Sequence, residues 1–83
     1  MEVIYLNNKI EKFILNLDST TRARTERMID LLEKHKYELE MPYSKALGGG
    51  LFELRILGKR QVRAIYSFKD KKAYIVHIFF KKS

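Results

Sequence analysis

The sequence contains no cysteine, a single proline and four glycines among its 83 residues. Without cysteine the chain has no disulfide scaffold, no thiolate zinc site and no cysteine nucleophile, and small secreted domains commonly depend on disulfides. The chain also has no basic start followed by a long apolar run, so the sequence indicates neither a signal peptide nor a membrane span. These absences predict a cytoplasmic protein that does not associate with membranes.

The length of the chain limits its architecture. A domain of this size buries about 60–65% of the surface that its unfolded chain exposes, which is enough for one core. We therefore expect residues 1–83 to form a single domain, and the length excludes large cofactor-binding folds. No cofactor is expected.

The positive charge is concentrated in the second half of the sequence. The chain as a whole has 17 Lys and Arg against 10 Asp and Glu, a formal net charge of +7. Residues 1–40 carry 7 basic and 8 acidic side chains (7 − 8 = −1), whereas residues 41–83 carry 10 basic and 2 acidic ones (10 − 2 = +8). Such a polycation favours a polyanionic partner, nucleic acid first and an acidic protein second.

The first half of the sequence predicts a strand and two helices. Residues 2–6 are rich in β-branched and aromatic types and predict a short strand, and Asn8 and Glu11 have the spacing of a capping box. Apolar residues at helical spacing follow in two groups: Ile10, Phe13, Ile14 and Leu17, then Met28, Ile29, Leu31 and Leu32. A short turn near Asp18 separates them, which predicts an antiparallel helical hairpin.

The second half predicts strands. After a glycine-containing connector at residues 43–50, strand-like runs occupy residues 51–57, 61–68 and 73–80. Short polar turns separate these runs, so they predict an antiparallel meander. The fold class expected from the whole chain is α+β, with an N-terminal strand, a two-helix hairpin and a three-stranded meander.

The alternation of side chains fixes an expected register. A three-residue loop at 58–60 pairs the apolar faces of the first two meander strands and sets Arg55 directly opposite Arg63 on the polar face. A three-residue loop at 69–71 would set Arg63 opposite His77.

Two arginines opposite each other destabilise a ladder, but they suit an anion, because the planar guanidinium binds phosphate oxygens in bidentate fashion. The alternative is that Glu53, which is diagonal to Arg63, forms an ion pair with one or both arginines. The two interpretations are compatible, since a carboxylate can hold an arginine in position.

Other polar residues surround this pair. Candidates for contacts to RNA are Lys45, Lys59, Arg60 and Tyr43. Lys81 and Lys82 follow the last strand, and each lysine alone is more often a solvated residue at the end of an element. His77 lies in an apolar strand and His35 at a helix end, and two isolated histidines do not predict a metal site.

The order of these motifs resembles a known family. The segments KALG at 45–48, LFELR at 51–55, VRAIY at 62–66 and HIFFKK at 77–82 are similar to the RelE/HigB toxins of bacterial type II toxin–antitoxin systems, especially the phage-derived HigB-like branch. This resemblance implies a RelE-like fold, here with its C-terminal helix absent or truncated. It also implies a metal-independent endoribonuclease that cuts ribosome-bound mRNA and arrests translation, neutralised by a cognate antitoxin in a hetero-oligomer.

By position, the resemblance makes Arg55 and Arg63 the residues that bind the scissile phosphate, and Lys81 or Lys82 a basic residue of the catalytic site. The candidates for proton transfer are Glu53, His77 and a lysine among Lys45, Lys81 and Lys82.

Two other functions fit the same residues. A non-catalytic module could use the basic sheet to bind nucleic acid or an acidic protein. The fold also occurs in ParE-like toxins that inhibit DNA gyrase, so the fold alone does not determine the activity.

Overall fold

The computed structural model describes residues 1–82, which form five strands, two α-helices and one short 3-10 helix. In chain order the elements are β1 (Glu2–Tyr5), α1 (Asn8–Leu15), α2 (Ser19–His35), η1 (Lys36–Glu38), β2 (Ser44–Gly48), β3 (Leu51–Ile56), β4 (Val62–Lys69) and β5 (Lys72–Phe80). The described residues contain no helix that is long and apolar enough to cross a membrane.

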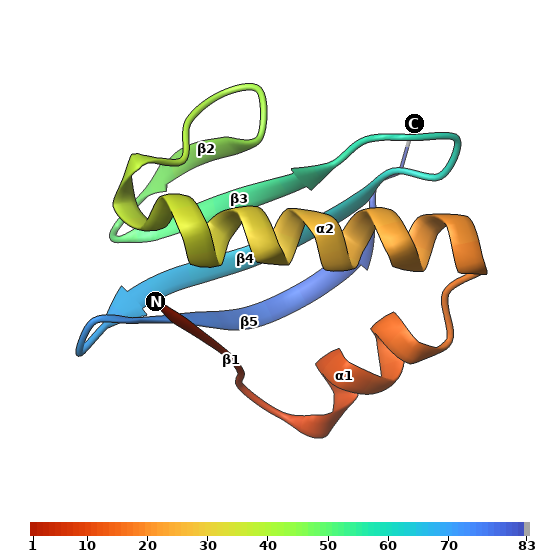
Figure 1. Ribbon diagram of the computed structural model, residues 1–83, viewed down its shortest axis with the longest axis horizontal. Coiled ribbons are helices and arrows are strands. Elements are labelled where there is room, and N and C mark those ends of the chain that lie inside the picture. The colour runs from red at the N-terminus through yellow and green to blue at the C-terminus, as the bar shows by residue number, and fades with distance from the viewer. Residues whose placement is uncertain (83) are drawn as a thin grey trace.

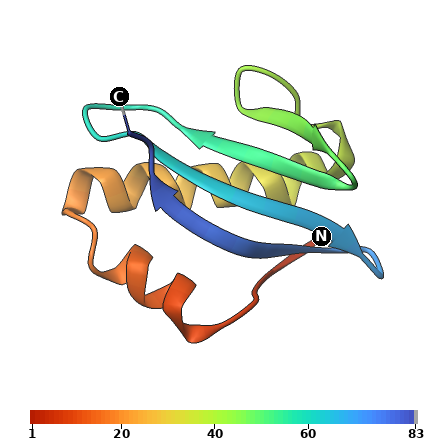
Figure 2. The same ribbon diagram turned by 180° about the vertical axis from the view of Figure 1, so that it is seen from behind.

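The strands form one mixed sheet in the order β1-β5-β4-β3-β2. β1 runs parallel to β5, and the other neighbouring strands are antiparallel. Figure 1 shows α2 in front of the strands, and Figure 2, seen from behind, shows the strands without a helix over them. One face of the sheet is therefore packed against the helices, and the other is left free by the helices of the described chain.

This sheet corrects the predicted fold. The α+β class is confirmed, but the sheet is not a three-stranded meander, because two further strands extend it. β1 pairs with the edge of β5, from Glu2 opposite Lys72 to Tyr5 opposite Ile75. The expected connector contributes β2, since Gly48, Gly49 and Gly50 have φ angles of 91°, 62° and 80°, which reverse the chain tightly onto β3.

The register between β4 and β5 also differs from the prediction. Arg55 lies opposite Arg63, as expected, but Arg63 lies opposite Phe79 and not opposite His77. The turn has two residues and not three, because Asp70 and Lys71 both adopt left-handed conformations (φ 52° and 62°). The shorter turn moves the pairing by one residue, and a β-bulge at Ile65/Tyr66 moves it by another, so the partner of Arg63 changes from His77 to Phe79.

The helices pack on the sheet more than on each other. The predicted capping box at Asn8 is wrong: Asn7 caps α1, and its side chain accepts hydrogen bonds from the backbone N–H groups of Lys9 and Ile10. α1 contacts β5 through the rings of Phe13 and Phe80, whose centroids are 4.9 Å apart. α2 lies against β3 and β1.

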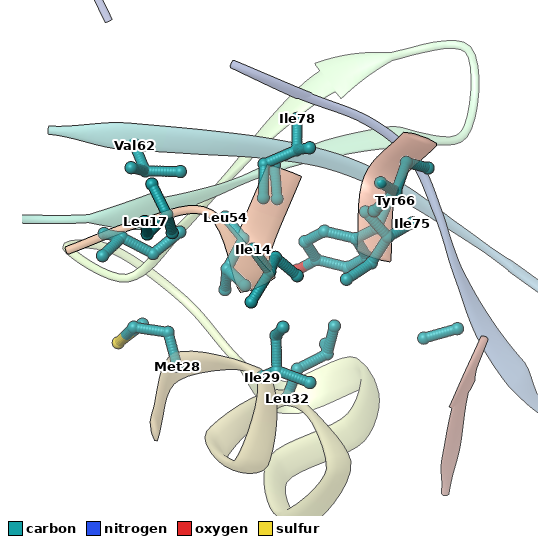
Figure 3. Packing of buried hydrophobic residues seen from close by; sticks show 14 residues of the cluster. Ile14, Leu17, Met28, Ile29, Leu32, Leu54, Val62, Tyr66, Ile75 and Ile78 are labelled. Atoms are coloured by element: carbon teal, nitrogen blue, oxygen red, sulfur yellow. The ribbon is translucent and has the colours of Figure 1, made fainter. Parts of the chain in front are cut away.

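The core lies between the helices and the sheet, and it confirms the apolar faces predicted from the sequence. Figure 3 shows α1, α2 and the strands contributing side chains to one cluster. Its buried hydrophobic members are Ile10, Ile14, Leu17, Met28, Ile29, Leu32, Leu54, Ile56, Val62, Ala64, Tyr66, Ala73, Ile75 and Ile78. Because alternate residues of each strand point into this cluster, the residues between them face away from the helices.

One polar contact inside the core provides a test of this packing. The hydroxyl groups of Ser44 and Tyr66 are hydrogen-bonded, and both residues are buried. Burial raises the pKa of Tyr66, and its hydrogen bond to Ser44 opposes that rise. The bond ties β2 to the centre of the sheet, across β3.

We expect Ser44→Ala to lower the free energy of unfolding by about 1–2 kcal/mol, because it leaves the buried Tyr66 hydroxyl without a partner. Adding Tyr66→Phe should recover part of this loss, since the unpaired hydroxyl is then gone. Urea denaturation of both variants measures the difference. A double variant less stable than Ser44→Ala would show that the hydroxyl pair does not matter.

Candidate nucleic-acid interface

The candidate site lies on the face of the sheet that α1 and α2 leave free, which we call the open face. Its central residues are Lys45, Glu53, Arg55, Arg63, Ile65, His77 and Phe79. The pairing of the strands arranges them in two adjacent rows. One row runs Lys45, Glu53, Ile65 and His77, and the other runs Arg55, Arg63 and Phe79. The structure thus brings together five polar residues that the sequence singled out.

Arg63 is the buried arginine of this face, with 2% of its surface exposed. Its Nη2 donates a hydrogen bond to Oε1 of Gln61 (2.9 Å), and its Nη1 donates one to the carbonyl oxygen of Val62 (3.2 Å). Burial lowers the pKa of Arg63, as does the nearby charge of Arg55, while Glu53 opposes the shift. The guanidinium remains a cation, because arginine is not deprotonated in proteins at neutral pH.

Arg55 is less enclosed and less well satisfied. Its side chain is 25% exposed, and its Nη1 lies 3.9 Å from Sδ of Met41, a weak contact. Its Nε is buried and has no hydrogen-bond partner within residues 1–82. Buried donors are normally paired, so this nitrogen is an exception, and it is the exposed quarter of the side chain that an acceptor from outside the described chain could reach.

Glu53 lies between the two arginines. Its Oε1 is 3.7 Å from Nε of Arg63 and 3.9 Å from Nε of Arg55. The prediction that Glu53 pairs with one or both arginines is therefore confirmed for both. One carboxylate cannot neutralise two guanidinium groups, so the cluster keeps a positive charge that favours an anion.

His77 is exposed on the open face and is not a core residue. Its ring stacks on that of Phe79, with the centroids 5.2 Å apart and the planes 28° apart. Phe79 lies directly opposite Arg63, so the imidazole and the guanidinium groups share one surface. An aromatic pair beside arginines is suited to stacking against a nucleobase.

Lys45 and Tyr43 lie toward the β2 side of this surface. Lys45 is exposed and opposite Glu53. The carbonyl oxygen of Tyr43 accepts a hydrogen bond from the N–H of Arg55 (2.8 Å), and the ring of Tyr43 is partly exposed. Both residues therefore lie close to the arginine pair in the sheet.

The remaining predicted RNA contacts lie at the turn between β3 and β4. Lys59, Arg60 and Lys81 line a hollow of about 360 Å³ together with Gln61 and Phe80. The guanidinium of Arg60 lies over the ring of Phe80, 3.8 Å from its centroid. Because Phe80 packs on Phe13 of α1, this contact places Arg60 on the helix side of the sheet, away from Arg55 and Arg63.

The end of β5 is tied to the start of β4. The N–H of Lys81 donates to the carbonyl oxygen of Gln61 (2.9 Å). Lys81 and Lys82 are exposed. Lys81 is therefore held near the same Gln61 that binds Arg63.

Three contributors to the site were not predicted from the sequence. Gln61 and Phe79 could have been found from the alternation of side chains. Gln61 directly precedes β4 and is two residues from Arg63, and Phe79 lies on β5 two residues from His77. Met41 gives no such signal, since its contact with Arg55 depends on the path of the loop before β2.

The arrangement can bind an anion and can place a phosphate next to an aromatic surface. Within residues 1–82 no group of three or more His, Cys, Asp or Glu side chains has the geometry to hold a metal ion. The open face carries guanidinium, imidazole, carboxylate and lysine side chains.

Comparison with known proteins identifies a family relationship. The family model described as Gp49, phage-derived protein Gp49-like (DUF891), matches residues 12–83. A search of the curated proteins finds no match. The family is associated with the toxins of toxin–antitoxin systems, although its description does not name RelE or HigB.

Proposed function

The chain belongs to the Gp49-like family of phage-derived proteins, and from this premise we propose that it is a toxin that cleaves messenger RNA on the ribosome. The observation that carries the proposal is the state of Arg55. Its guanidinium lies on the open face beside a second arginine, its side chain is 25% exposed, and its Nη1 makes only a weak contact with Sδ of Met41. A phosphate of the RNA backbone would supply a stronger acceptor for the terminal nitrogens.

The proposed reaction needs no group from outside the chain and the RNA. The ribose 2′-oxygen attacks the adjacent phosphorus, the bond from phosphorus to the 5′-oxygen of the next nucleotide breaks, and a 2′,3′-cyclic phosphate forms. One proton leaves the attacking hydroxyl and one joins the leaving oxygen. Arg55 would stabilise the charge that builds on the phosphoryl oxygens, a role worth about 3–4 kcal/mol for one well-placed donor.

Proton transfer is assigned to His77. The imidazole is exposed on the same face as Arg55, and histidine is the side chain that most often transfers protons in active sites. Glu53 is less suited, because its Oε1 already lies between two arginines. Lys81 and Lys82, at the end of β5, would bind the RNA backbone beyond the cleavage point.

The ribosome and an antitoxin complete the proposal. A surface with one free guanidinium and one histidine is expected to cleave free RNA slowly, and orientation of the mRNA by the ribosome would supply much of the rate. A cognate antitoxin would neutralise the chain by covering the open face, whose excess positive charge suits an acidic partner.

Induction of the chain in growing bacteria tests this function. We expect translation to stop and primer extension to reveal cuts in translated messages, with no cuts in messages that lack a start codon. The matched control is Arg22→Ala. Arg22 lies on α2, which covers the opposite face of the sheet, and its Nε is 3.5 Å from Oε2 of Glu26 on the same helix. This control should arrest growth like the parent chain.

Other outcomes would contradict the proposal. Folded protein that binds RNA in a salt-dependent way without cutting it would indicate a binding module. A DNA-damage response with translation intact would indicate inhibition of gyrase. Equal cleavage of naked and ribosome-bound RNA would remove the ribosome from the mechanism.

A further inference from the structure

A groove lies between α2 and the end of β3, and one end of it reaches Arg55. It has a volume of about 370 Å³. Met28, Leu31 and Leu57 form its apolar lining, and Tyr43 borders it from the loop before β2. Its lining comes from α2, from the end of β3 and from the loop before β2, and it includes Arg55, so the groove runs from α2 toward the open face.

The apolar part of this groove is incompletely covered. Leu57 is 50% exposed and Tyr43 is 46% exposed, whereas Met28 at the bottom is 8% exposed. Exposed apolar side chains that gather in a groove with a charged border are typical of a surface that binds another protein.

The border of the groove is basic. Arg24 and Arg27 line it from α2, and no Asp or Glu of the described residues lines it. Neither arginine forms an ion pair within residues 1–82, whereas Arg22 on the same helix pairs with Glu26. Arg24 also lies against Gly58, whose lack of a side chain leaves room for its guanidinium.

We propose that this groove binds an amphipathic helix of another protein, with acidic side chains facing Arg24 and Arg27. The basic residues and the apolar lining of α2 at positions 24, 27, 28 and 31 follow one helical stripe, roughly 10 Å long. A second helix laid along such a stripe inserts apolar side chains at i, i+3 or i+4 and i+7. Its carboxylates pair with the two arginines that lack a partner in the described chain.

The composition of the groove favours a peptide over RNA. Phosphates would pair with the arginines, but Met28, Leu31 and Leu57 give nucleobases no ring to stack on, and Tyr43 is the one aromatic side chain among the described residues that line the groove. The groove also reaches Arg55, so an acidic side chain bound at that end would compete with a phosphate for it. This last consequence rests on the proposed function, whereas binding in the groove does not.

Isotope-labelled protein titrated with a synthetic peptide tests the proposal by NMR. The probe is a helical peptide of about four turns with leucines on one face and glutamates on the other. We expect amide shifts concentrated in residues 24–31 and at Leu57. A peptide with glutamine in place of every glutamate should bind about tenfold more weakly or worse.

Matched variants make the test specific. Arg24→Gln combined with Arg27→Gln should weaken binding of the acidic peptide about tenfold, and Arg22→Gln should leave it unchanged. All three arginines are on the outer part of α2, so circular dichroism should show an intact fold. Binding that persists in the double variant would overturn the proposal. So would shifts confined to the open face, or tighter binding of a short single-stranded RNA to the same amides. None of these results depends on RNA cleavage.

Discussion

Replacing Arg63 with alanine is expected to lower the free energy of unfolding by about 3 kcal/mol, near the lower end of the range for breaking a buried ion pair. Arg63 is 2% exposed, and its guanidinium donates to Gln61 and to the backbone of Val62 while facing Glu53 at 3.7 Å. Alanine would remove all of these contacts and leave a cavity beside a partly buried carboxylate.

From the sequence alone the opposite effect is expected for this residue, because opposed arginines repel each other and removing one should stabilise the ladder. The charge of Arg55 lowers the pKa of Arg63, after burial, in the direction that such repulsion predicts. This repulsion is outweighed by the cost of removing the hydrogen-bond donor of Gln61 and the nearer of the two arginines that pair with Glu53.

Urea denaturation of Arg63→Ala and Arg22→Ala measures this effect. Arg22 is a solvated residue in an i,i+4 pair on α2, so its replacement should change the stability by no more than about 0.5 kcal/mol. Arg63→Met keeps much of the side-chain volume and should lose less than Arg63→Ala. If Arg63→Ala is as stable as the control, then Arg63 is a surface residue and the assigned burial is wrong.

The parts of the fold that depend on local pattern could be predicted from the sequence. The alternation of apolar residues in residues 51–68 and the length of the turn at 58–60 were enough to set Arg55 opposite Arg63. The helical spacing of apolar residues likewise identified the buried faces of both helices.

The parts of the fold that could not be predicted depend on contacts between segments that are distant in the sequence. Nothing in residues 2–5 specifies a parallel partner, because that pairing with β5 forms only after both helices have turned the chain back. The β4–β5 register depends on two features that the local sequence does not indicate strongly. One is a turn with left-handed residues at Asp70 and Lys71, and the other is a bulge at Ile65/Tyr66. Glycines at 48–50 indicated a turn, but they did not indicate that the residues before them form a strand.

The sequence also could not predict how the side chains of the two arginines at the candidate site differ in their surroundings. Their sequence positions are equivalent, each on the polar face of a strand, and both pair with Glu53. Arg63 also donates hydrogen bonds to Gln61 and to the carbonyl oxygen of Val62, whereas Arg55 has only a weak contact with a sulfur atom besides Glu53. The neighbours of each guanidinium decide which arginine holds the sheet together and which is available to a ligand.

Replacing Arg55 with alanine should therefore lower the cleavage rate without unfolding the domain. On the proposed function the loss is about 100- to 1000-fold in the rate of mRNA cleavage, the range found when one preorganised donor to a transition-state oxygen is removed. The free energy of unfolding should change little. The ion pair that is lost is long, with Nε of Arg55 3.9 Å from Oε1 of Glu53, and this Nε has no hydrogen bond within residues 1–82. Removing Arg55 also relieves its repulsion with Arg63.

The measurement is primer extension on a translated reporter message, with urea denaturation and ribosome binding of the same variants. Arg55→Lys keeps the charge but loses the bidentate fork, so it should recover part of the activity and less than full activity. Ribosome binding of Arg55→Ala should stay close to that of the parent chain, because Arg55 is one of many basic residues in the second half of the sequence. A folded Arg55→Ala variant that cleaves at the parent rate would show that phosphate is bound elsewhere. A variant that loses ribosome binding and cleavage together would show that Arg55 acts in docking and not on the reacting phosphate.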